Sequence, residues 1–462
     1  MLTVIELIIE SFVKDWRKCG GKKSLRPSIL EKHWNFFSKH TLLLKLLTRC
    51  LHRRLSDLKN INHESLPDYL LLLELELIQG KYHQVLAASD KLSERFSKDL
   101  RLQDVRCRSH IAVQYKEGTS NYRSLALNPF KDYFCVEPFQ KFTVSASGYV
   151  TVCCTNWIDS SIGSVYKHNF EEVWHSQAAQ AIRASILDGS YRYCNKMACP
   201  HLRQRSLPKR DNSKLDAYTR DIIRTESVTS CTPRKIVLAE DPTCNLTCPS
   251  CRSGPVFAER DKLEHFEKEI LPKLLTDNVM TLQVAGHGEP FASKHYWKVL
   301  RSLSAHKHPT LTLCIVTNAV LFNPKVWNAL PNLHDLKVIV GLSIDGASKD
   351  TFESIRRGGD WSALLSNLAF LGELRAKKQL HLLNINFVVQ RENYHEMEKM
   401  LRLAEQHHVD KVKFLNIHKT GDHFTDQDYK EKAVHLSSHA EYEKYRSIIA
   451  SDALNSQRVE YS

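Results

Sequence analysis

The stretch Cys244-Asn245-Leu246-Thr247-Cys248-Pro249-Ser250-Cys251 places three cysteines within eight residues, directly after a predicted strand at 235–239. The C-x₃-C-x₂-C spacing brings three thiols to one inorganic centre and leaves a fourth metal position without an obvious protein ligand. Because iron–sulfur clusters ordinarily take four cysteine thiolates, the motif predicts a cluster in which one iron binds something other than protein. Structural zinc is the alternative, but it needs a fourth Cys or His at finger-like spacing. Cys231 and His265 are the nearest candidates, and neither has that spacing.

The length and composition indicate a large intracellular protein. With 462 residues, 42% of them hydrophobic, the chain is long enough for about two or three domains. Its 13 cysteines are clustered, and the N-terminus lacks the pattern of a secretory signal, so we expect reduced thiols and a cytoplasmic location. The most apolar run, 69–78, is short and contains Glu74 and Glu76, which predicts no membrane span.

The sequence is basic, with a formal net charge of +13. Such a charge can indicate nucleic acid, an anionic surface or an acidic substrate. There is no zinc finger, RNA-binding aromatic signature or unbroken block of Lys and Arg in the sequence. We therefore favour a basic solvated surface over nucleic-acid binding.

Residues 1–128 are predicted to be helical, because apolar side chains recur every three or four residues. Two predicted helices, 69–79 and 83–96, flank a turn that contains Gly80, and this hairpin resembles a tetratricopeptide unit. No clear second copy follows at the same period. The region would suit docking of a peptide or protein, and a helical N-terminal cap is the alternative.

The periodicity changes near residue 133. Apolar and polar residues alternate through 142–152 around Gly148, which predicts a β-hairpin. A helical segment is predicted next, at 170–187. The segment 206–232 is charged and turn-forming, which predicts a basic linker.

Five cysteines lie around this hairpin and the helical segment. Four of them suffice for one fully ligated iron–sulfur cluster: Cys135, Cys153, Cys194 and Cys199. Zinc is again the alternative, because a hairpin that ends in cysteines is also typical of zinc ribbons. Cys154 is expected to be a buried thiol, since it points to the opposite face from Cys153 if the strand continues.

The spacing C-x₁₂-G-x₄-C of Cys135, Gly148 and Cys153 resembles the start of a SPASM domain, the auxiliary-cluster module of many radical S-adenosylmethionine (radical SAM) enzymes. Later residues of the segment resemble the same family: Gly163, Glu172-Val173-Trp174, Arg183 and the closing Cys194-x₄-Cys199-Pro200. The resemblance implies one auxiliary [4Fe-4S] cluster, because members with two such clusters have more cysteines after the hairpin. The order is unusual, because the module here precedes the radical domain.

Beyond the linker, strand-type runs alternate with helical ones, which is typical of a parallel α/β barrel or sheet. Six strands are predicted, at 235–239, 281–285, 311–317, 338–344, 382–389 and 412–417. Six strands are too few for a closed eight-stranded barrel. From residue 421 the sequence is polar and helical, and we expect it to cover an open edge or the bottom of the barrel.

The motif Cys244/Cys248/Cys251 resembles the signature of the radical SAM superfamily, whose domains are partial (β/α)₆ TIM-type barrels with reactive groups at the C-terminal ends of the strands. The run Gly286-His287-Gly288-Glu289-Pro290 follows the second predicted strand, as the glycine-rich motif of that family does. The resemblance implies that Gly286, Gly288 and Glu289 bind the methionine part of S-adenosylmethionine. It implies that Ser343 and Asp345, after the fourth strand, contact its ribose and carboxylate.

Two residues depart from the family's pattern. Ser250 stands where the family often has an aromatic residue near the adenine, and Ala319 stands where relatives often have glycine. The residue patterns and the resemblance together predict an α/β fold with five parts: an N-terminal helical region at 1–128, a SPASM-like domain at 129–205, a basic linker at 206–232, a radical SAM partial barrel at 233–420 and a C-terminal helical segment at 421–462.

The implied function is reductive cleavage of S-adenosylmethionine to a 5′-deoxyadenosyl radical, which then removes hydrogen from a substrate. The helical hairpin favours a peptide or protein substrate, and radical oxidation or epimerisation of a sugar or other small molecule is the alternative. A reducing partner such as flavodoxin or ferredoxin would supply electrons. A non-catalytic interaction protein with two zinc sites is the alternative from another class.

Overall fold

The computed structural model describes residues 130–462, except 159, 197, 420–423 and 462, and a few positions between 72 and 92. Apart from those positions, the predicted helices of 1–128 and their hairpin lie outside the described residues. The chain divides into two compact units. The first comprises Met1–Phe139, Thr151–Ile162 and Trp174–Cys231, and the second comprises Gln140–Val150, Gly163–Val173 and Thr232–Ser462.

Within the described residues, the second unit is built on a ten-stranded sheet in the order β10-β9-β8-β7-β6-β5-β4-β1-β2-β3. Its six central strands run parallel and follow one another along the chain: β4 (Lys235–Ala239), β5 (Thr281–Val284), β6 (Thr312–Thr317), β7 (Lys337–Ser343), β8 (Leu382–Val389) and β9 (Lys411–Asn416). Each lies within one residue of a strand predicted from the sequence.

The strands form where β-branched and apolar residues recur at every second position. In β6, the side chains of Leu313, Ile315 and Thr317 are buried on one face, while Cys314 and Val316 are half-buried on the other. This alternation fixes which face packs against helices, because a shift of one residue would exchange the two faces.

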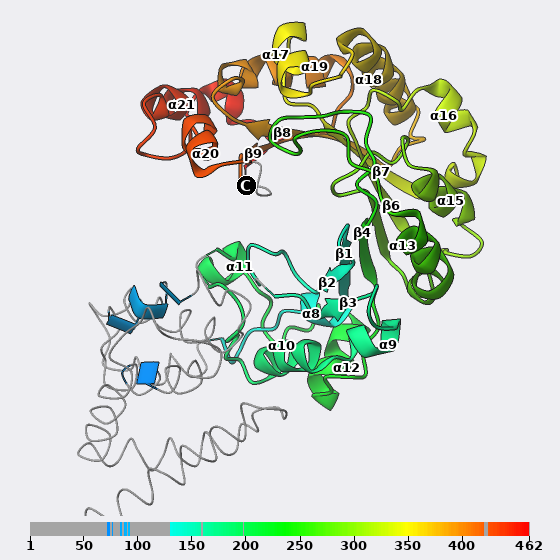
Figure 1. Cartoon of the computed structure of the whole chain (residues 1–462), viewed down its shortest axis with the longest axis vertical. Coiled ribbons are helices and arrows are strands. Elements are labelled where there is room, and N and C mark those ends of the chain that lie inside the picture. The colour runs from blue at the N-terminus through cyan, green and yellow to red at the C-terminus, as the bar shows by residue number, and fades with distance from the viewer. Residues whose placement is uncertain are drawn as a thin grey trace, which may run out of the picture. The chain divides into compact units, whose positions relative to one another are not determined.

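Helices connect the parallel strands and cover the outer side of the curving sheet (Figure 1). They include α15 (Lys294–Ser302), α16 (Pro324–Asn328), α17 (Lys349–Ile355), α18 (Trp361–Ala376) and α19 (Met397–Gln406). Three of them begin at a side chain that accepts from the backbone of the first turn: Ser293, Asn323 and Asp360. The other face of the sheet is left for the loops at the strand ends.

Four strands extend the sheet of the described residues beyond the six that were predicted in parallel. β1 (Lys141–Ser145), the first strand of the predicted hairpin, pairs in parallel with β4. The second strand of the predicted hairpin, β2 (Tyr149–Thr151), lies beside β1 in the sheet and pairs antiparallel with β3 (Gly163–Ser164), which was not predicted. At the other edge, β10 (Val459–Tyr461) pairs in parallel with β9, so the C-terminal segment covers an edge that would otherwise expose unpaired backbone groups.

Short helices flank the C-terminal strand and the loop that carries Cys244, Cys248 and Cys251, which we call the cysteine loop. After the cysteine loop the chain forms α13 (Arg260–His265), the π-helical turn η2 (Phe266–Ile270) and α14 (Leu271–Leu274). Before β10 it forms α20 (Asp426–Lys432) and α21 (Tyr442–Ile449). No helix in the part of the chain that the structure describes is long and apolar enough to cross a membrane.

In the first unit, the buried side chain of Arg183 joins three segments of the chain. Arg183 lies on α10 (Gln177–Leu187), donates to Pro138 O at 2.9 Å and Val228 O at 3.0 Å, and stacks 4.2 Å from the Trp174 ring. The helical segment predicted at 170–187 is two helices, α9 (Phe170–Trp174) and α10, because Ser176 caps the start of the second.

The segment predicted as a turn-forming linker contains a helix, α12 (Ala217–Thr225). Asp216 caps it by accepting from Thr219 N at 2.7 Å, and Ile222 buries its inner face. A short helix, α11 (Pro200–Arg203), begins directly after Cys199. The density of Lys and Arg concealed this amphipathic pattern in the sequence.

Candidate functional site

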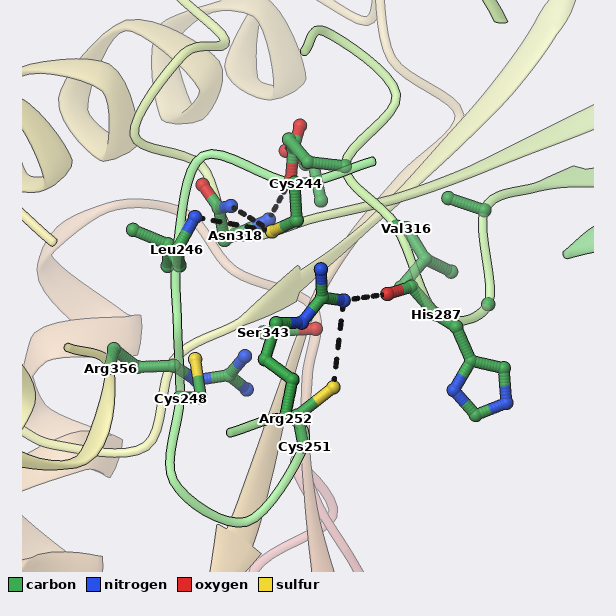
Figure 2. Close-up of a pocket in the computed structure, with 15 residues that line it drawn as sticks. Cys244, Leu246, Cys248, Cys251, Arg252, His287, Val316, Asn318, Ser343 and Arg356 are labelled. Carbon is green, nitrogen blue, oxygen red and sulfur yellow. Dashed lines mark hydrogen bonds between the residues drawn. The ribbon is translucent and has the colours of Figure 1, made fainter. Parts of the chain in front are cut away.

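The C-terminal ends of β4, β5, β6 and β7 surround a cavity of about 110 Å³. Cys244, Cys248 and Cys251 line it, as do the loop 285–289 and Ser343. Figure 2 shows the three cysteines on one loop that curves around the cavity. The ends of parallel strands share one edge of a sheet, and this edge brings residues that are distant in the sequence to one site.

The cysteine loop and the glycine-rich loop are in backbone contact. Glu289 N donates to Thr243 O at 2.8 Å. A Cβ atom at Gly288 would lie 2.3 Å from Asp241 O, and one at Gly286 would lie 2.8 Å from the Ala239 Cβ. Both positions therefore require glycine because the two loops approach so closely.

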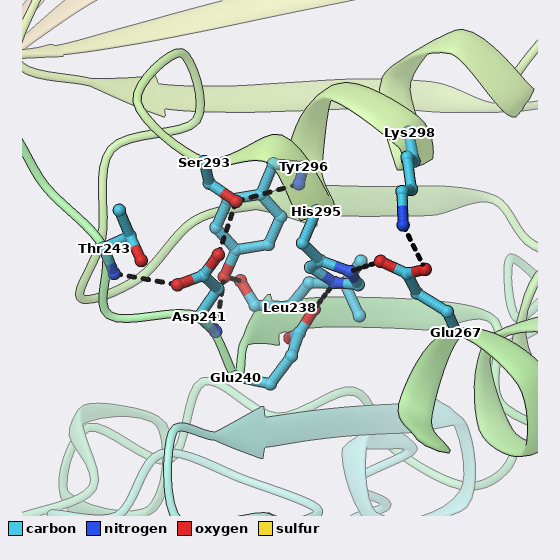
Figure 3. Close-up of polar contacts among 9 residues, drawn as sticks. All are labelled: Leu238, Glu240, Asp241, Thr243, Glu267, Ser293, His295, Tyr296 and Lys298. Carbon is cyan, nitrogen blue, oxygen red and sulfur yellow. Dashed lines mark hydrogen bonds and ion pairs between the residues drawn. The ribbon is translucent and has the colours of Figure 1, made fainter. Parts of the chain in front are cut away.

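Asp241 anchors the start of the cysteine loop to α15 (Figure 3). Its carboxylate accepts from Thr243 N at 2.9 Å and from the Ser293 hydroxyl, while its backbone N–H donates to Tyr296 Oη at 3.2 Å. Ser293 also caps α15 by accepting from Tyr296 N at 3.0 Å. One buried carboxylate thus fixes the loop before Cys244 to the helix that follows the glycine-rich loop.

A second buried network beside it centres on His295 (Figure 3). His295 Nε2 lies 2.7 Å from Glu240 Oε1, and its Nδ1 lies 2.8 Å from Glu267 Oε1. Both ring nitrogens face carboxylates, so the arrangement is satisfied by the doubly protonated imidazolium. Lys298 completes the chain of charges by donating to Glu267 Oε2 at 2.7 Å.

The network connects both ends of the cysteine loop, because Glu240 follows β4 and Glu267 lies in η2. Burial lowers the pKa of His295, but the hydrogen bonds and charges of the two carboxylates outweigh it and raise that pKa overall. Burial raises the pKa of Glu240, with His295 opposing part of the shift.

Glu289 is buried and holds the end of β6. Its Oε1 accepts from Thr317 Oγ1 at 2.7 Å, and its Oε2 accepts from Asn318 N at 2.7 Å. Burial raises the pKa of Glu289 to about 7, although the hydrogen bonds from Asn318 and Thr317 oppose the shift. The carboxylate therefore lines the cavity while organising the neighbouring strand end.

The two residues predicted after the fourth strand differ in position. Ser343 lines the cavity, whereas Asp345 stands behind Arg356, which does line it. Asp345 Oδ2 pairs with Arg356 Nη2 at 2.7 Å, and Asp345 Oδ1 accepts from Val388 N at 2.7 Å. Arg356, which ends α17, is a site residue that sequence reasoning missed; the adjacent Gly358-Gly359 pair was the available signal.

Arg252 is the other cationic residue that sequence reasoning missed. It follows Cys251 directly, is 7% exposed, and lines the same cavity. A hydrogen bond from the His287 side chain and the nearby Arg252 lower the pKa of Cys251 to about 7, although burial opposes them. Burial raises the pKa of Cys244 and Cys248. The sequence signal for Arg252 was its place as a basic residue directly after the third cysteine.

Two alanines at the strand ends adopt left-handed backbone conformations. Ala285, which lines the cavity, has φ of 68°, and Ala319, which follows β6, has φ of 66°. Asn367 Nδ2 holds the second by donating to Ala319 O at 2.8 Å and Val320 O at 2.9 Å. Such conformations cost about 1–2 kcal/mol for a residue with a Cβ, so local strain is concentrated beside the cavity.

The first unit contains the other predicted cysteine ligands. Burial raises the pKa of Cys135, and the thiols of Cys153 and Cys199 raise it further, which indicates that these three lie near one another. Burial raises the pKa of Tyr191, and the nearby thiols of Cys135 and Cys194 raise it further. Cys194 and Cys199 are buried, with 7% and 8% of their surfaces exposed.

Cys154 also belongs to this neighbourhood. Burial raises the pKa of Cys199, and the Cys154 thiol contributes to the shift. The expectation that Cys154 points to the opposite face depended on a continuous strand, but β2 ends at Thr151 and the next residues form a bend. Alternation between faces therefore does not apply at Cys153 and Cys154.

The donors at both sites suit iron–sulfur clusters. The three thiols of the second unit line a cavity from one loop, and the thiols of the first unit gather within one compact body. Within the described residues, no group of three or more His, Cys, Asp or Glu side chains is arranged to hold a single metal ion. Neither Cys231 nor His265 lines the cavity; His265 Nε2 lies 3.1 Å from Val165 O.

Residues 135–200 match the family SPASM, described as an iron–sulfur cluster-binding domain. The match includes all four cysteines assigned to the auxiliary cluster, so the predicted SPASM domain is confirmed. This stretch of the chain is an iron–sulfur cluster-binding domain. No curated protein matches the sequence.

Solved structures that resemble the chain include Streptococcus suis SuiB bound to S-adenosylmethionine and anSMEcpe with bound AdoMet and Kp18Cys peptide. The SuiB structure has a TM-score of 0.38 and 15% identity, and the match covers 63% of this chain and 62% of SuiB. The anSMEcpe structure has a TM-score of 0.33 and 20% identity, with 49% and 62% covered. SuiB bound to precursor peptide SuiA matches with a TM-score of 0.38 and 14% identity, with 63% and 64% covered. The chain therefore spans less than two thirds of the length of each.

Proposed function

We propose that this protein is a radical SAM enzyme whose strands β4–β9 form a partial (β/α)₆ barrel and whose SPASM domain holds one auxiliary [4Fe-4S] cluster. The observation that carries the proposal is the convergence of three thiols, the glycine-rich loop and Ser343 on one cavity. When bound, the three-thiolate cluster supplies an electron that cleaves S-adenosylmethionine, and the resulting 5′-deoxyadenosyl radical removes hydrogen from the substrate.

The residues around the cavity have separate tasks in this proposal. Cys244, Cys248 and Cys251 hold the cluster and leave one position open. The close approach of the glycine-rich loop exposes backbone groups to the methionine end of the ligand, and Glu289 offers a carboxylate to its ammonium group. Ser343 contacts the ribose or carboxylate end.

Arg356 separates Asp345 from the cavity, so the predicted contact of Asp345 with the ligand is proposed through Arg356. A guanidinium that lines the cavity suits an anionic ligand group better than a second carboxylate does. Asp345 then orients the guanidinium, while its other oxygen accepts from Val388 N near the end of β8.

We propose a peptide or protein as the substrate, because the predicted N-terminal helical hairpin suits docking of such a partner. Radical oxidation or epimerisation of a sugar remains the second candidate within the same chemistry. A reducing protein such as flavodoxin or ferredoxin would deliver the electron. The substrate classes are distinguished by which compound carries deuterium into 5′-deoxyadenosine.

The test of the proposed function is metal and product analysis of anaerobically reconstituted full-length protein. We expect about eight irons and a matching amount of labile sulfide per chain on a two-cluster account, and 5′-deoxyadenosine on addition of S-adenosylmethionine and dithionite. Zinc without labile sulfide would instead support the non-catalytic protein with two zinc sites and would remove the enzyme proposal.

A further inference from the structure

The three thiols at the cavity differ in the charge of the groups that lie beside them. At Cys244 they are neutral: Leu246 N at 3.4 Å and Asn318 Nδ2 at 3.8 Å from Sγ. These two donors belong to the loop itself and to the end of β6 (Figure 2). They fix the Cys244 sulfur without adding a formal charge.

Guanidinium groups lie beside the other two thiols. Arg252 Nη2 donates to Cys251 Sγ at 3.7 Å, and Arg356 lines the same cavity as Cys248, whose pKa its positive charge lowers against the effect of burial. Figure 2 shows both guanidinium groups within the curve of the cysteine loop. The cysteine loop is therefore asymmetric, with cationic groups beside its second and third cysteines.

Arg252 is held in place by more than the thiol. Its Nη1 donates to Pro242 O at 2.8 Å, and its Nη2 also donates to His287 O. The planar guanidinium thus links Pro242, two residues before the first cysteine, with the glycine-rich loop and Cys251. A lysine ammonium has no such planar fork and cannot reproduce this set of directions.

Arg356 is fixed by its ion pair with Asp345, and its side chain is 17% exposed. Its Nε is buried and has no hydrogen-bond partner in the part of the chain that the structure describes. A buried guanidinium with an unmet donor is costly unless a further anionic group is placed near it. Arg356 itself lines the cavity.

Positive charge at these positions acts on the energy of reduction. A cluster held by three thiolates becomes more negative by one charge when it is reduced, and Coulomb attraction to a nearby cation stabilises the reduced form more than the oxidised one. Hydrogen bonds to the sulfurs and net charge are among the determinants of cluster potentials. Two guanidinium groups, that of the buried Arg252 and that of the half-buried Arg356, should therefore favour reduction.

We propose that Arg252 and Arg356 are positioning residues that raise the reduction potential of the cluster on Cys244, Cys248 and Cys251. The inference rests on the proposed function. In the step concerned, one electron passes from an external one-electron reductant to the cluster; no bond to either arginine forms or breaks, and no proton is transferred.

The test is an anaerobic redox titration of the reconstituted full-length protein, followed by electron paramagnetic resonance (EPR) without S-adenosylmethionine. The signal of this cluster is the one lost in Cys248→Ala. In Arg252→Gln and in Arg356→Gln, we expect the equilibrium constant for reduction to fall at least tenfold, which is about 59 mV for one electron. Arg252→Lys, which keeps the charge, should fall between wild type and Arg252→Gln.

The matched control is Arg301→Gln, because Arg301 is an exposed arginine on α15 that stacks 4.9 Å from the Trp297 ring and does not line the cavity. It should leave the potential unchanged. Full iron content with a wild-type potential in both glutamine variants would overturn this inference and leave the proposed function standing. Loss of iron in both glutamine variants and in Arg252→Lys would make the arginines structural and also overturn it. If Cys248→Ala loses no signal, the proposed function itself fails.

Discussion

The cysteine loop of the second unit and the cysteine group of the first unit differ in how their thiols are placed and in the pKa values of those thiols. Cys244, Cys248 and Cys251 lie on one loop at the edge of a cavity, and the pKa of Cys251 is lowered to about 7. In the first unit, burial raises the pKa of Cys135 and Cys199, as it does at Cys244 and Cys248 of the loop, so Cys251 differs from these four.

The sources of the thiols differ in the same way. The loop takes three thiols from eight consecutive residues, whereas the SPASM domain draws its four from separate segments between 135 and 199. Three thiols leave one iron open to a ligand, while four thiols saturate a cluster. On the proposed function, the three thiols of the cysteine loop are arranged for ligand binding and the four thiols of the SPASM domain for a closed centre.

The largest effect is expected from removing a thiol of the open site. Cys248→Ala should abolish formation of 5′-deoxyadenosine from S-adenosylmethionine and dithionite, because the site has no spare protein ligand. Cys314→Ala is the matched control: this half-buried cysteine on β6 does not line the cavity and should keep both iron content and cleavage. Cleavage by Cys248→Ala at the wild-type rate would contradict the assignment.

Removing two thiols of the closed site should separate cleavage from product formation. The double variant Cys194→Ala/Cys199→Ala should lose about half its iron on a two-cluster account, still make 5′-deoxyadenosine, and form no product from the true substrate. Retention of all its iron would show that these two cysteines are not cluster ligands.

Cys154, the fifth cysteine of the first unit's group, tests which thiols hold the auxiliary cluster. Cys153→Ala should lose the auxiliary iron, whereas Cys154→Ala should retain it if Cys154 is not a ligand. Because Cys154 lies near Cys199, iron analysis of the two single variants side by side decides the ligand set. Equal loss in both would replace the set proposed here.

A smaller effect is expected at Glu289. Glu289→Ala leaves Thr317 and Asn318 without their acceptor and removes a carboxylate from the cavity. The loss of one charge-assisted hydrogen bond, about 1.5–3 kcal/mol, should raise the Kd for S-adenosylmethionine roughly 10- to 150-fold with iron content unchanged. The exposed Glu373→Ala is the control, and loss of iron in Glu289→Ala would mean a structural role instead.

The smallest effect concerns the pH dependence of stability from the His295 network. The pKa of His295 is raised from 6.5, so its contribution is fully present below pH 6.5 and is lost as the pH rises through the folded-state value. The raised pKa of Glu240 acts in the same direction, whereas the pKa of Glu267 is lowered, so its contribution is lost only in acid.

Thermal unfolding between pH 6 and 9 checks this sign. The Tm of the wild type should fall more steeply with rising pH than the Tm of His295→Gln, which lacks the ionisable ring. His306→Gln, on a surface loop, is the control and should follow the wild type. Parallel curves for wild type and His295→Gln would show that the network does not titrate in this range.

The six parallel strands could be predicted from the sequence because each is a short run of alternating or continuous apolar residues bounded by turns. Their predicted bounds agree within one residue with β4–β9. The pairings at both edges could not be predicted. β1 pairs with β4 and β10 with β9 across long stretches of chain, and a local pattern carries no information about such partners.

Part of the candidate site could also be predicted from the sequence, and part could not. The cysteine and glycine motifs are local, and the rule that strand ends meet at one edge brought Cys244, Gly286 and Ser343 together. Arg356 lies more than a hundred residues after Cys251, and only tertiary packing shows that it stands between Asp345 and the cavity. The Asp345 side chain, just after β7, is held by a hydrogen bond from Val388 N of β8. Its direction therefore depends on the neighbouring strand, which a local motif does not show.

The most direct test of the central claim is the EPR spectrum of the dithionite-reduced protein recorded with and without S-adenosylmethionine. If the three-thiolate cluster binds this ligand at its open iron, addition of S-adenosylmethionine should change the spectrum of the wild type and of Cys194→Ala/Cys199→Ala, and should change nothing in Cys248→Ala. An unchanged wild-type spectrum, or a change that persists in Cys248→Ala, would contradict the account.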